Sequence, residues 1–165
     1  MTWIAVPVSP REVTATSLFD ISKQHRLLPD DVSLAIDYFK SVCDNCAVIR
    51  VVDEESEEEI GVLIITSIVD GNTADVDFIP HPQFFSPDAN YREDISAALS
   101  PVFAKLMEGR GLRRLTSMVP KSRSRTKHAL IACGFKKEGV MRNAVKFAKR
   151  DAEDVVILGM IPEKE

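Results

Sequence analysis

Residues 134–142 read GFKKEGVMR, and this short run decides how the C-terminal part of the chain folds. It follows an apolar stretch, 123–133, whose spacing predicts a helix. Gly134 is suited to the position directly after a helix, because a left-handed backbone costs a residue with a Cβ about 1 kcal/mol or more. Phe135 should then start a strand and bury its ring under the helix, and Gly139 fits a bulge within that strand. The run therefore predicts a helix, a tight turn and a bulged strand.

Outward from this run, apolar periodicity and turn residues predict a mixed α/β domain spanning 1–165. We expect two short helices within 17–42, broken at Pro29, and a helix that contains Ile95, ends at Gly109 and is followed by the helix at 123–133. Pro101 should bend the third helix or confine its regular part, because proline lacks a backbone donor. Strands are expected at 3–8, 46–52, 60–69, 73–80, 112–119, 135–142 and 154–161.

Composition places the chain among ordinary globular proteins. It has 165 residues, of which 45% are hydrophobic and 28% charged, so it can bury a core without disulfide staples. No apolar run is long enough to span a membrane, and the N-terminus lacks the features of a secretory signal. Three cysteines without framework spacing fit a reducing compartment. The cytoplasm is therefore the expected location, with no membrane partner.

Charge is distributed unevenly along the chain. Residues 1–104 carry 6 Lys and Arg against 18 Asp and Glu, whereas residues 105–150 carry 14 Lys and Arg against 2 Asp and Glu. A basic half in an acidic protein indicates an anionic partner at one place, such as a phosphate-bearing cofactor, or two halves that neutralise each other across the fold.

The run 129–161, ALIACGFKKEGVMRNAVKFAKRDAEDVVILGMI, resembles the C-terminal half of the GNAT superfamily of acetyl-CoA-dependent N-acyltransferases. It is most similar to the branch that acetylates protein N-termini, including those of ribosomal proteins. The resemblance extends over 74–161 and reaches the first 70 residues only through element order. It implies a mostly antiparallel sheet of about seven strands, with splayed fourth and fifth strands, and about four helices. The matching residues are Gly134, Phe135, Glu138, Gly139, Arg142 and Asp154.

The same resemblance implies acetyl-CoA as the cofactor. In the family, the gap between the splayed strands holds the pantetheine arm, and a glycine-rich loop after the fourth strand cradles the pyrophosphate. This chain has no glycine between Phe84 and Ile95, and it places three acids there against one cation, Arg92. Arg123 stands at the family's asparagine position, and Thr126 at its serine position. The cofactor loop is therefore either rewritten or degenerate.

If the protein is an enzyme, its reaction needs a base for the incoming ammonium group and donors for the thioester carbonyl. Asp75, Asp77 and His81 are the candidate bases, and histidine ordinarily titrates near neutral pH. The alternative is a solvent-facing polar stripe followed by a loop histidine. The candidate cofactor-binding residues are Phe78 and Ile79, through their backbone amides, with Arg92, Arg123, Thr126 and Lys127.

No metal site is predicted. Cys43 and Cys46 have the spacing of metal and redox sites, but Cys133 is the only other cysteine and the histidines are scattered. The acidic run 53–59 is expected to form a solvated hairpin tip, because calcium loops interleave their acids with glycine and other oxygen ligands. Trp3, with the two phenylalanines at 84–85, is expected in the core or in a subunit contact.

These observations leave two main functional hypotheses. The first is an N-acetyltransferase acting on a protein N-terminus or a small amine. The second is a GNAT-like protein without catalytic activity that serves as a structural or interaction module, in a homo-oligomer or a larger assembly such as the virion of a tailed phage. A third class, a nucleic-acid adaptor, follows from the basic half alone. It is disfavoured because no aromatic residue alternates with the cations around Arg123.

Overall fold

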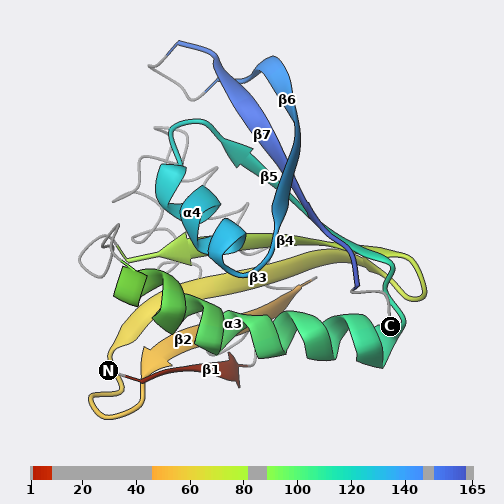
Figure 1. The fold of residues 1–165 in the computed structure, drawn as a ribbon. Coiled ribbons are helices and arrows are strands. Elements are labelled where there is room, and N and C mark those ends of the chain that lie inside the picture. Colours follow the sequence, from red (N-terminus) through yellow and green to blue (C-terminus); the bar gives the residue numbers. More distant parts are fainter. Residues whose placement is uncertain (1, 9–45, 82–88, 147–150, 163–165) are drawn as a thin grey trace.

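The computed structural model describes residues 2–8, 46–81, 89–146 and 151–162, and Figure 1 shows their arrangement. They form one seven-stranded sheet with the strand order β1-β2-β3-β4-β5-β7-β6. The predicted mixed α/β fold with seven strands is confirmed, and the two helices expected within 17–42 lie outside the described residues. The elements are β1 (Trp3–Val8), β2 (Ala47–Asp53), β3 (Glu59–Val69), β4 (Thr73–Pro80), α3 (Ala89–Arg110), β5 (Arg114–Pro120), α4 (Ser124–Ala132), β6 (Lys136–Val145) and β7 (Glu153–Met160).

Helices α3 and α4 lie on the same face of the sheet, where they share one hydrophobic cluster with the strands (Figure 1). Within it, the rings of Phe103 and Phe135 meet edge to face with centroids 5.3 Å apart. Trp3 packs in the same way against Tyr91, at 5.7 Å, which confirms that it belongs to the core. The phenylalanines at 84–85 lie outside the described residues. Burial of such rings is the main force that holds helices on this face.

The turn after α4 forms as the sequence predicts. Gly134 has a φ of +104°, and its N–H donates to the Ile131 carbonyl, while the N–H of Phe135 donates to the Leu130 carbonyl. These two hydrogen bonds are those of a Schellman motif, which satisfies carbonyls that the last helical turn would leave unpaired. Phe135 and Leu130 are both buried, so the turn also fixes an apolar contact.

The sheet opens between β4 and β5. These two strands run parallel and pair over only three positions, from Thr73 opposite Arg114 to Asp75 opposite Thr116. Beyond these positions, residues 76–80 of β4 have no partner on β5, and Figure 1 shows the two strands diverging. The other neighbouring strands are antiparallel. The predicted splay of the fourth and fifth strands is therefore confirmed.

The C-terminal hairpin, β6 and β7, carries the predicted bulge. The register between the strands shifts between Lys137 and Gly139, which fits the expectation for a glycine inside a strand. A second shift precedes Val145, where Asn143 has a φ of +54° and its N–H donates to Asp154 Oδ1 at 2.8 Å. Asp154 thus stabilises a backbone conformation that costs most residues energy.

The acidic run 53–59 does not lie entirely in a solvated hairpin tip, so that expectation is wrong at both ends of the run. Asp53 ends β2 and Glu59 begins β3. Asp53 is buried, and its Oδ1 accepts hydrogen bonds from the N–H groups of Ser56 and Glu55, both at 3.0 Å. These bonds hold the pKa of Asp53 below its ordinary value although burial opposes them. The turn itself is closed by a carboxylate, as in an Asx-turn.

Helix α3 differs from the expectation at its start and at Pro101, whereas its end at Arg110 agrees with the predicted stop near Gly109. It begins at Ala89, so residues 92–94 lie inside the helix, whereas the sequence placed them in a phosphate-binding loop. It also continues through Pro101 to its last residue, so the expectation that Pro101 confines the helix is wrong. Ile95 and Leu99 are fully buried against the sheet. Tertiary packing of that face compensates for the hydrogen bond that proline cannot donate.

Candidate functional site

The edge of β4 that leaves β5 carries a buried polar cluster. The Phe78 carbonyl accepts a hydrogen bond from Thr126 Oγ1 at 2.7 Å and one from Arg123 Nη2 at 3.3 Å. Arg123 Nη1 donates to Asp77 Oδ2 at 3.1 Å, and its Nη2 lies 3.0 Å from Oδ1. The Arg123 side chain is only 10% exposed. The structure thus brings together four of the residues predicted from the sequence, from β4 and from the start of α4.

The contacts in this cluster involve Asp77 and Arg123, two residues for which the sequence predicts other roles. Asp77, a candidate base, is held in an ion pair with Arg123, a candidate phosphate ligand. Arg123 would have to give up the Asp77 carboxylate and the Phe78 carbonyl before it could bind a phosphate group. Both functional assignments stay predictions, but the structure shows what each would require.

The start of α4 lies beside this cluster and has the properties of an anion-binding position. Arg123 is its N-cap residue without a capping side-chain hydrogen bond, and its first turn contains no acidic residue. The preceding turn is fixed by Ser122, whose N–H and Oγ donate to Glu153 at 3.0 and 2.7 Å. Lys127 is half-buried within α4. Backbone N–H groups at a helix start favour negative charge, so the cofactor role of Lys127 remains a prediction that this position supports.

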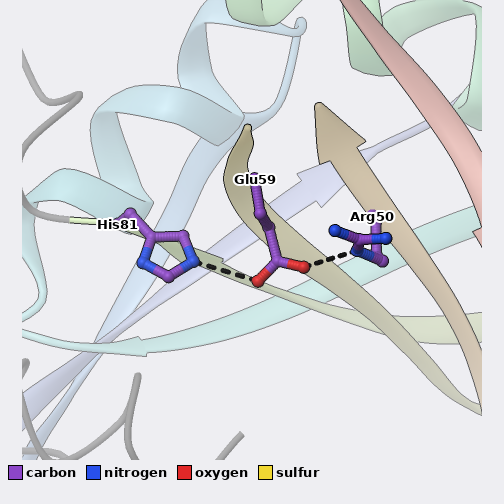
Figure 2. Close-up of polar contacts among 3 residues, drawn as sticks. All are labelled: Arg50, Glu59 and His81. Carbon is purple, nitrogen blue, oxygen red and sulfur yellow. Dashed lines mark hydrogen bonds and ion pairs between the residues drawn. The ribbon is translucent and has the colours of Figure 1, made fainter. Parts of the chain in front are cut away.

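A second polar group lies on the opposite side of β4, across β3. Figure 2 shows Glu59 between His81 and Arg50, with one carboxylate oxygen turned to each. His81 Nε2 is 3.0 Å from Glu59 Oε1, and Arg50 Nε donates to Oε2 at 2.5 Å. The His81 and Glu59 side chains are 16% and 23% exposed. These contacts join three neighbouring strands at the end of β4.

The electrostatics of Glu59 follow from this arrangement. Burial alone would raise the pKa of its carboxyl group, but the hydrogen bonds from His81 and Arg50, with the positive charge of Arg50, outweigh burial and lower it. Glu59 is therefore an ionised acceptor at neutral pH. It holds one ring nitrogen of His81 in a fixed direction.

Strand alternation places the candidate bases on one face of β4. Ala74, Val76 and Phe78 belong to the hydrophobic cluster beneath α3 and α4, so Asp75 and Asp77 point to the other face. Both aspartates are half-buried. The alternative of a simple solvent-facing stripe is therefore incomplete, because these carboxylates are partly shielded from water.

The remaining predicted residues are separate from these clusters. Ile79 is 2% exposed within β4, and its backbone lies opposite Val62 of β3. Arg92 is exposed in the first turns of α3.

Sequence reasoning missed Glu59 and Arg50. The sequence pattern places Glu59 in the acidic run 53–59, directly before the apolar strand that begins at Ile60. Position 59 lies beside the ring because the His81 N–H donates to the Ile60 carbonyl at 2.8 Å. No signal in the sequence indicates this contact, since register between β3 and β4 cannot be read from spacing alone.

A cavity of about 760 Å³ lies elsewhere, between the second half of α3 and the ends of β6 and β7. Met107, Cys133 and Met160 are among its lining residues, and none of the predicted site residues lines it. Burial raises the pKa of the Cys133 thiol to about 12, so that thiol is protonated and unreactive at neutral pH.

Metal-ligand clusters and membrane-spanning helices are both absent from the part of the chain that the structure describes. No group of three or more His, Cys, Asp or Glu side chains in that part is placed to hold a metal ion. Cys43 lies outside it, so the pair with Cys46 is not tested. Neither of the two described helices is long and apolar enough to cross a bilayer.

Comparisons with known proteins give no match in sequence but many in structure. Neither a family model nor a curated protein matches the sequence. The structure is similar to that of ribosomal-protein-S5-alanine acetyltransferase from Vibrio fischeri, with a TM-score of 0.70 and 14% identity over 98% of this chain and 93% of that one.

Two further neighbours have the same architecture. A spermidine N-acetyltransferase variant from Vibrio cholerae has a TM-score of 0.67 and 16% identity, over 97% of this chain and 94% of that one. The Microcin C7 self-immunity acetyltransferase MccE is solved in complex with acetyl-CoA and AMP. It has a TM-score of 0.67 and 13% identity, over 96% of this chain and 93% of that one. The resemblance carried by residues 129–161 is confirmed at the level of structure, and the chain has the fold of the GNAT acetyltransferases.

Proposed function

We propose that this protein is an acetyl-CoA-dependent N-acetyltransferase whose acceptor is a protein N-terminus or a small amine. The observation that carries the proposal is the separation of β4 from β5 after three paired positions. Residues 76–80 present a strand edge without a β5 partner, and an extended ligand with amide groups can pair with such an edge. MccE, which shares the fold, is solved with acetyl-CoA. This supports the same ligand class here.

The residues at the gap fit this ligand. The β4 backbone at Phe78, which faces the gap, would hold the pantetheine arm, while Lys127 at the start of α4 would meet phosphate oxygens. The ligand supplies an activated acetyl group. His81, at the end of β4 where the gap opens, takes a proton from the incoming ammonium group. Asp75, half-buried on the same face, attracts a cationic acceptor.

Helix α3 weakens the argument for a degenerate cofactor loop. Because the helix starts at Ala89, Glu93 and Asp94 lie after its first turn and not among the free N–H groups of its N-terminus. Repulsion between these acids and a phosphate is therefore weaker than the sequence implied.

A GNAT-fold protein without catalysis, with a structural or interaction role, is the second candidate. The observation that favours it is the occupation of the Phe78 carbonyl by Thr126 and Arg123. A ligand that needs this carbonyl has to displace both donors. The Arg123 side chain can therefore either bind the cofactor or block the gap. The two roles predict opposite effects of its removal on acetyl-CoA affinity.

Calorimetric titration of acetyl-CoA into the wild type and Arg123→Ala tests the proposal. If Arg123 anchors a phosphate, the variant binds more weakly, whereas tighter binding shows that Arg123 blocks the gap. Lys121→Ala is a matched control, since Lys121 is an exposed cation in the same turn. Absence of binding at millimolar acetyl-CoA in both wild type and Arg123→Ala contradicts the proposal.

The acceptor is tested by the release of CoA thiol. The neighbours suggest two probes. One is spermidine, and the other is a peptide that begins with alanine. Peptide acetylation would support a protein N-terminus as the acceptor, and spermidine acetylation would support a small amine. Binding of acetyl-CoA without transfer to either probe would favour the non-catalytic candidate.

A further inference from the structure

The imidazole of His81 is held by a contact with Glu59 that the proposed chemistry does not yet use. Glu59 Oε1 contacts Nε2 at 3.0 Å, and the His81 N–H donates to the Ile60 carbonyl at 2.8 Å. Arg50 fixes the other carboxylate oxygen at 2.5 Å. Backbone and ring of His81 are therefore both anchored to β3, and Glu59 is itself anchored to β2.

The contact determines which ring nitrogen is basic. An ionised carboxylate can only accept, so in the neutral ring the proton must lie on Nε2. The lone pair is then on Nδ1, and Figure 2 shows this second nitrogen on the side of the ring turned away from Glu59. Among the described residues, no hydrogen bond to His81 Nδ1 is present. In the neutral ring, Nδ1 is thus the nitrogen whose lone pair can accept a proton.

We infer that Glu59, backed by Arg50, is a positioning residue that fixes the Nε2–H tautomer of His81 and so makes Nδ1 the proton acceptor for the incoming amine. The inference rests on the proposed N-acetyltransferase function. Neither Glu59 nor Arg50 contacts the reacting atoms in this scheme, since they act through the histidine.

The proton balance is simple. The ammonium group of the acceptor loses one proton to Nδ1, which leaves a neutral amine and an imidazolium ring with a proton on each nitrogen. The freed lone pair of the amine forms the new C–N bond to the acetyl carbon, and the C–S bond breaks with its electron pair on sulfur. The second proton of the nitrogen goes to the thiolate, and His81 returns its own proton to water. Glu59 stabilises the imidazolium while it lasts.

The first test is spectroscopic and does not require activity. Nitrogen-15 NMR at alkaline pH should show the two ring nitrogens of His81 as a single Nε2–H tautomer in the wild type. Glu59→Gln should give a mixture, because an amide can either donate to Nε2 or accept from it. His128, exposed on α4, is the internal reference. A mixture of tautomers in the wild type would overturn the inference.

The second test is kinetic and uses acetyl-CoA with whichever of the alanine peptide and spermidine is acetylated. His81→Gln keeps a donor for Glu59 but has no basic nitrogen, and it should lower kcat by about 10² to 10⁴. Glu59→Gln should lower kcat by a smaller factor with KM unchanged, and Glu59→Asp should recover part of the loss. Glu58→Gln, which removes an exposed carboxylate from the same acidic run, should match the wild type.

The outcomes distinguish failure of the proposed function from failure of the positioning role of Glu59. Absence of transfer by the wild type contradicts the proposed function and the catalytic role of the pair together. Transfer that is unaffected in His81→Gln, or a Glu59→Gln enzyme with wild-type kcat, contradicts the positioning role alone. Urea unfolding of each variant shows whether it is folded, and a Glu59→Gln variant that fails to fold is replaced by Arg50→Gln, which frees Glu59 without removing it. Wild-type kcat in a folded Arg50→Gln variant with a mixed His81 tautomer overturns the inference.

Discussion

At the scale of single residues, Gly134 offers the sharpest stability prediction. Its φ of +104° is one that a side chain with a Cβ rarely adopts. Gly134→Ala should therefore lower the free energy of unfolding by about 1–2 kcal/mol in urea denaturation. Gly109→Ala is the control with the opposite sign. Gly109 lies in helix α3 with no atom within 4 Å of a new Cβ, so alanine should stabilise by about 0.5–1 kcal/mol.

Thr126 supplies a second prediction at this scale. Its buried hydroxyl donates to the Phe78 carbonyl at 2.7 Å, and Arg123 Nη2 is the carbonyl's longer contact at 3.3 Å. Thr126→Val keeps the shape and should cost about 1 kcal/mol. The same change at Thr116, a half-buried residue of β5 that accepts from Arg114 Nε, should stay within about 0.5 kcal/mol. Equal costs at the two sites would mean that the Thr126 bond is not the stabilising contact.

Glu59 predicts a pH dependence of stability. Its pKa is lowered in the folded state from an ordinary value of 4.5. A lowered pKa stabilises the protein above the ordinary value, and this contribution is lost as the pH falls through the folded-state pKa. The difference in unfolding free energy between wild type and Glu59→Gln should therefore be largest near pH 7 and shrink below about pH 4.5. Urea unfolding across this range measures it, and a difference that grows towards acid pH would contradict the assignment.

At the scale of the elements, Gly159 tests how the C-terminal strands pack. It lies in β7 opposite Lys136, beneath the ion pair of Arg114 and Glu138. A Cβ there would overlap the Glu138 carboxylate and come within 2.7 Å of Arg114 Nη2. Gly159→Ala should displace these flexible side-chain ends and separate the exposed pair, at a cost of up to about 1 kcal/mol.

The control for this substitution lies on the neighbouring strand. A Cβ at Gly139 would meet only Ile157 Cδ1 at 3.8 Å, an ordinary contact. Gly139→Ala should therefore change the midpoint of thermal unfolding much less than Gly159→Ala. Similar losses in both variants would show that the bulge, and not the ion pair, determines the cost.

The elements were predictable from the sequence because each depends on local pattern. Alternation over 73–80 and the glycine after α4 identify their elements without knowledge of the rest of the chain. The contacts of the candidate site were not predictable in the same way. His81 meets Glu59 across 22 positions, and Arg123 meets Phe78 across 45. Such contacts depend on strand register and on how α4 docks beside the β4 edge, which periodicity does not encode. The continuation of α3 through Pro101 was not predictable for the same reason, since it depends on tertiary packing.

At the scale of the whole molecule, the support of His81 and the proposed ligand gap lie in different parts of the sheet. The antiparallel strands β1 to β3 form a continuous support that anchors His81 through Glu59, while the parallel pair β4 and β5 separates to form the proposed ligand gap. The polar residues at these two places come from different parts of the chain, Arg50 and Glu59 before the gap and Arg123 and Thr126 after it. The proposed acetyl transfer would require both to be in register, so a shift of β3 against β4 would misplace the proposed base without closing the gap.

This division predicts how ligands stabilise the molecule. A ligand that binds only the folded state at 100 times its Kd stabilises it by about 2.7 kcal/mol, which raises the Tm of a chain of this size by roughly 5–10 °C. Acetyl-CoA should produce this shift in differential scanning calorimetry. If the β4 edge supplies most of the affinity, pantetheine should raise the Tm more than adenosine 3′,5′-bisphosphate at equal concentration, because only pantetheine has amide groups to pair with residues 76–80. The reverse order would place the main contacts at phosphate-binding N–H groups and cations such as Lys127, and would show that the splay is not the principal binding feature.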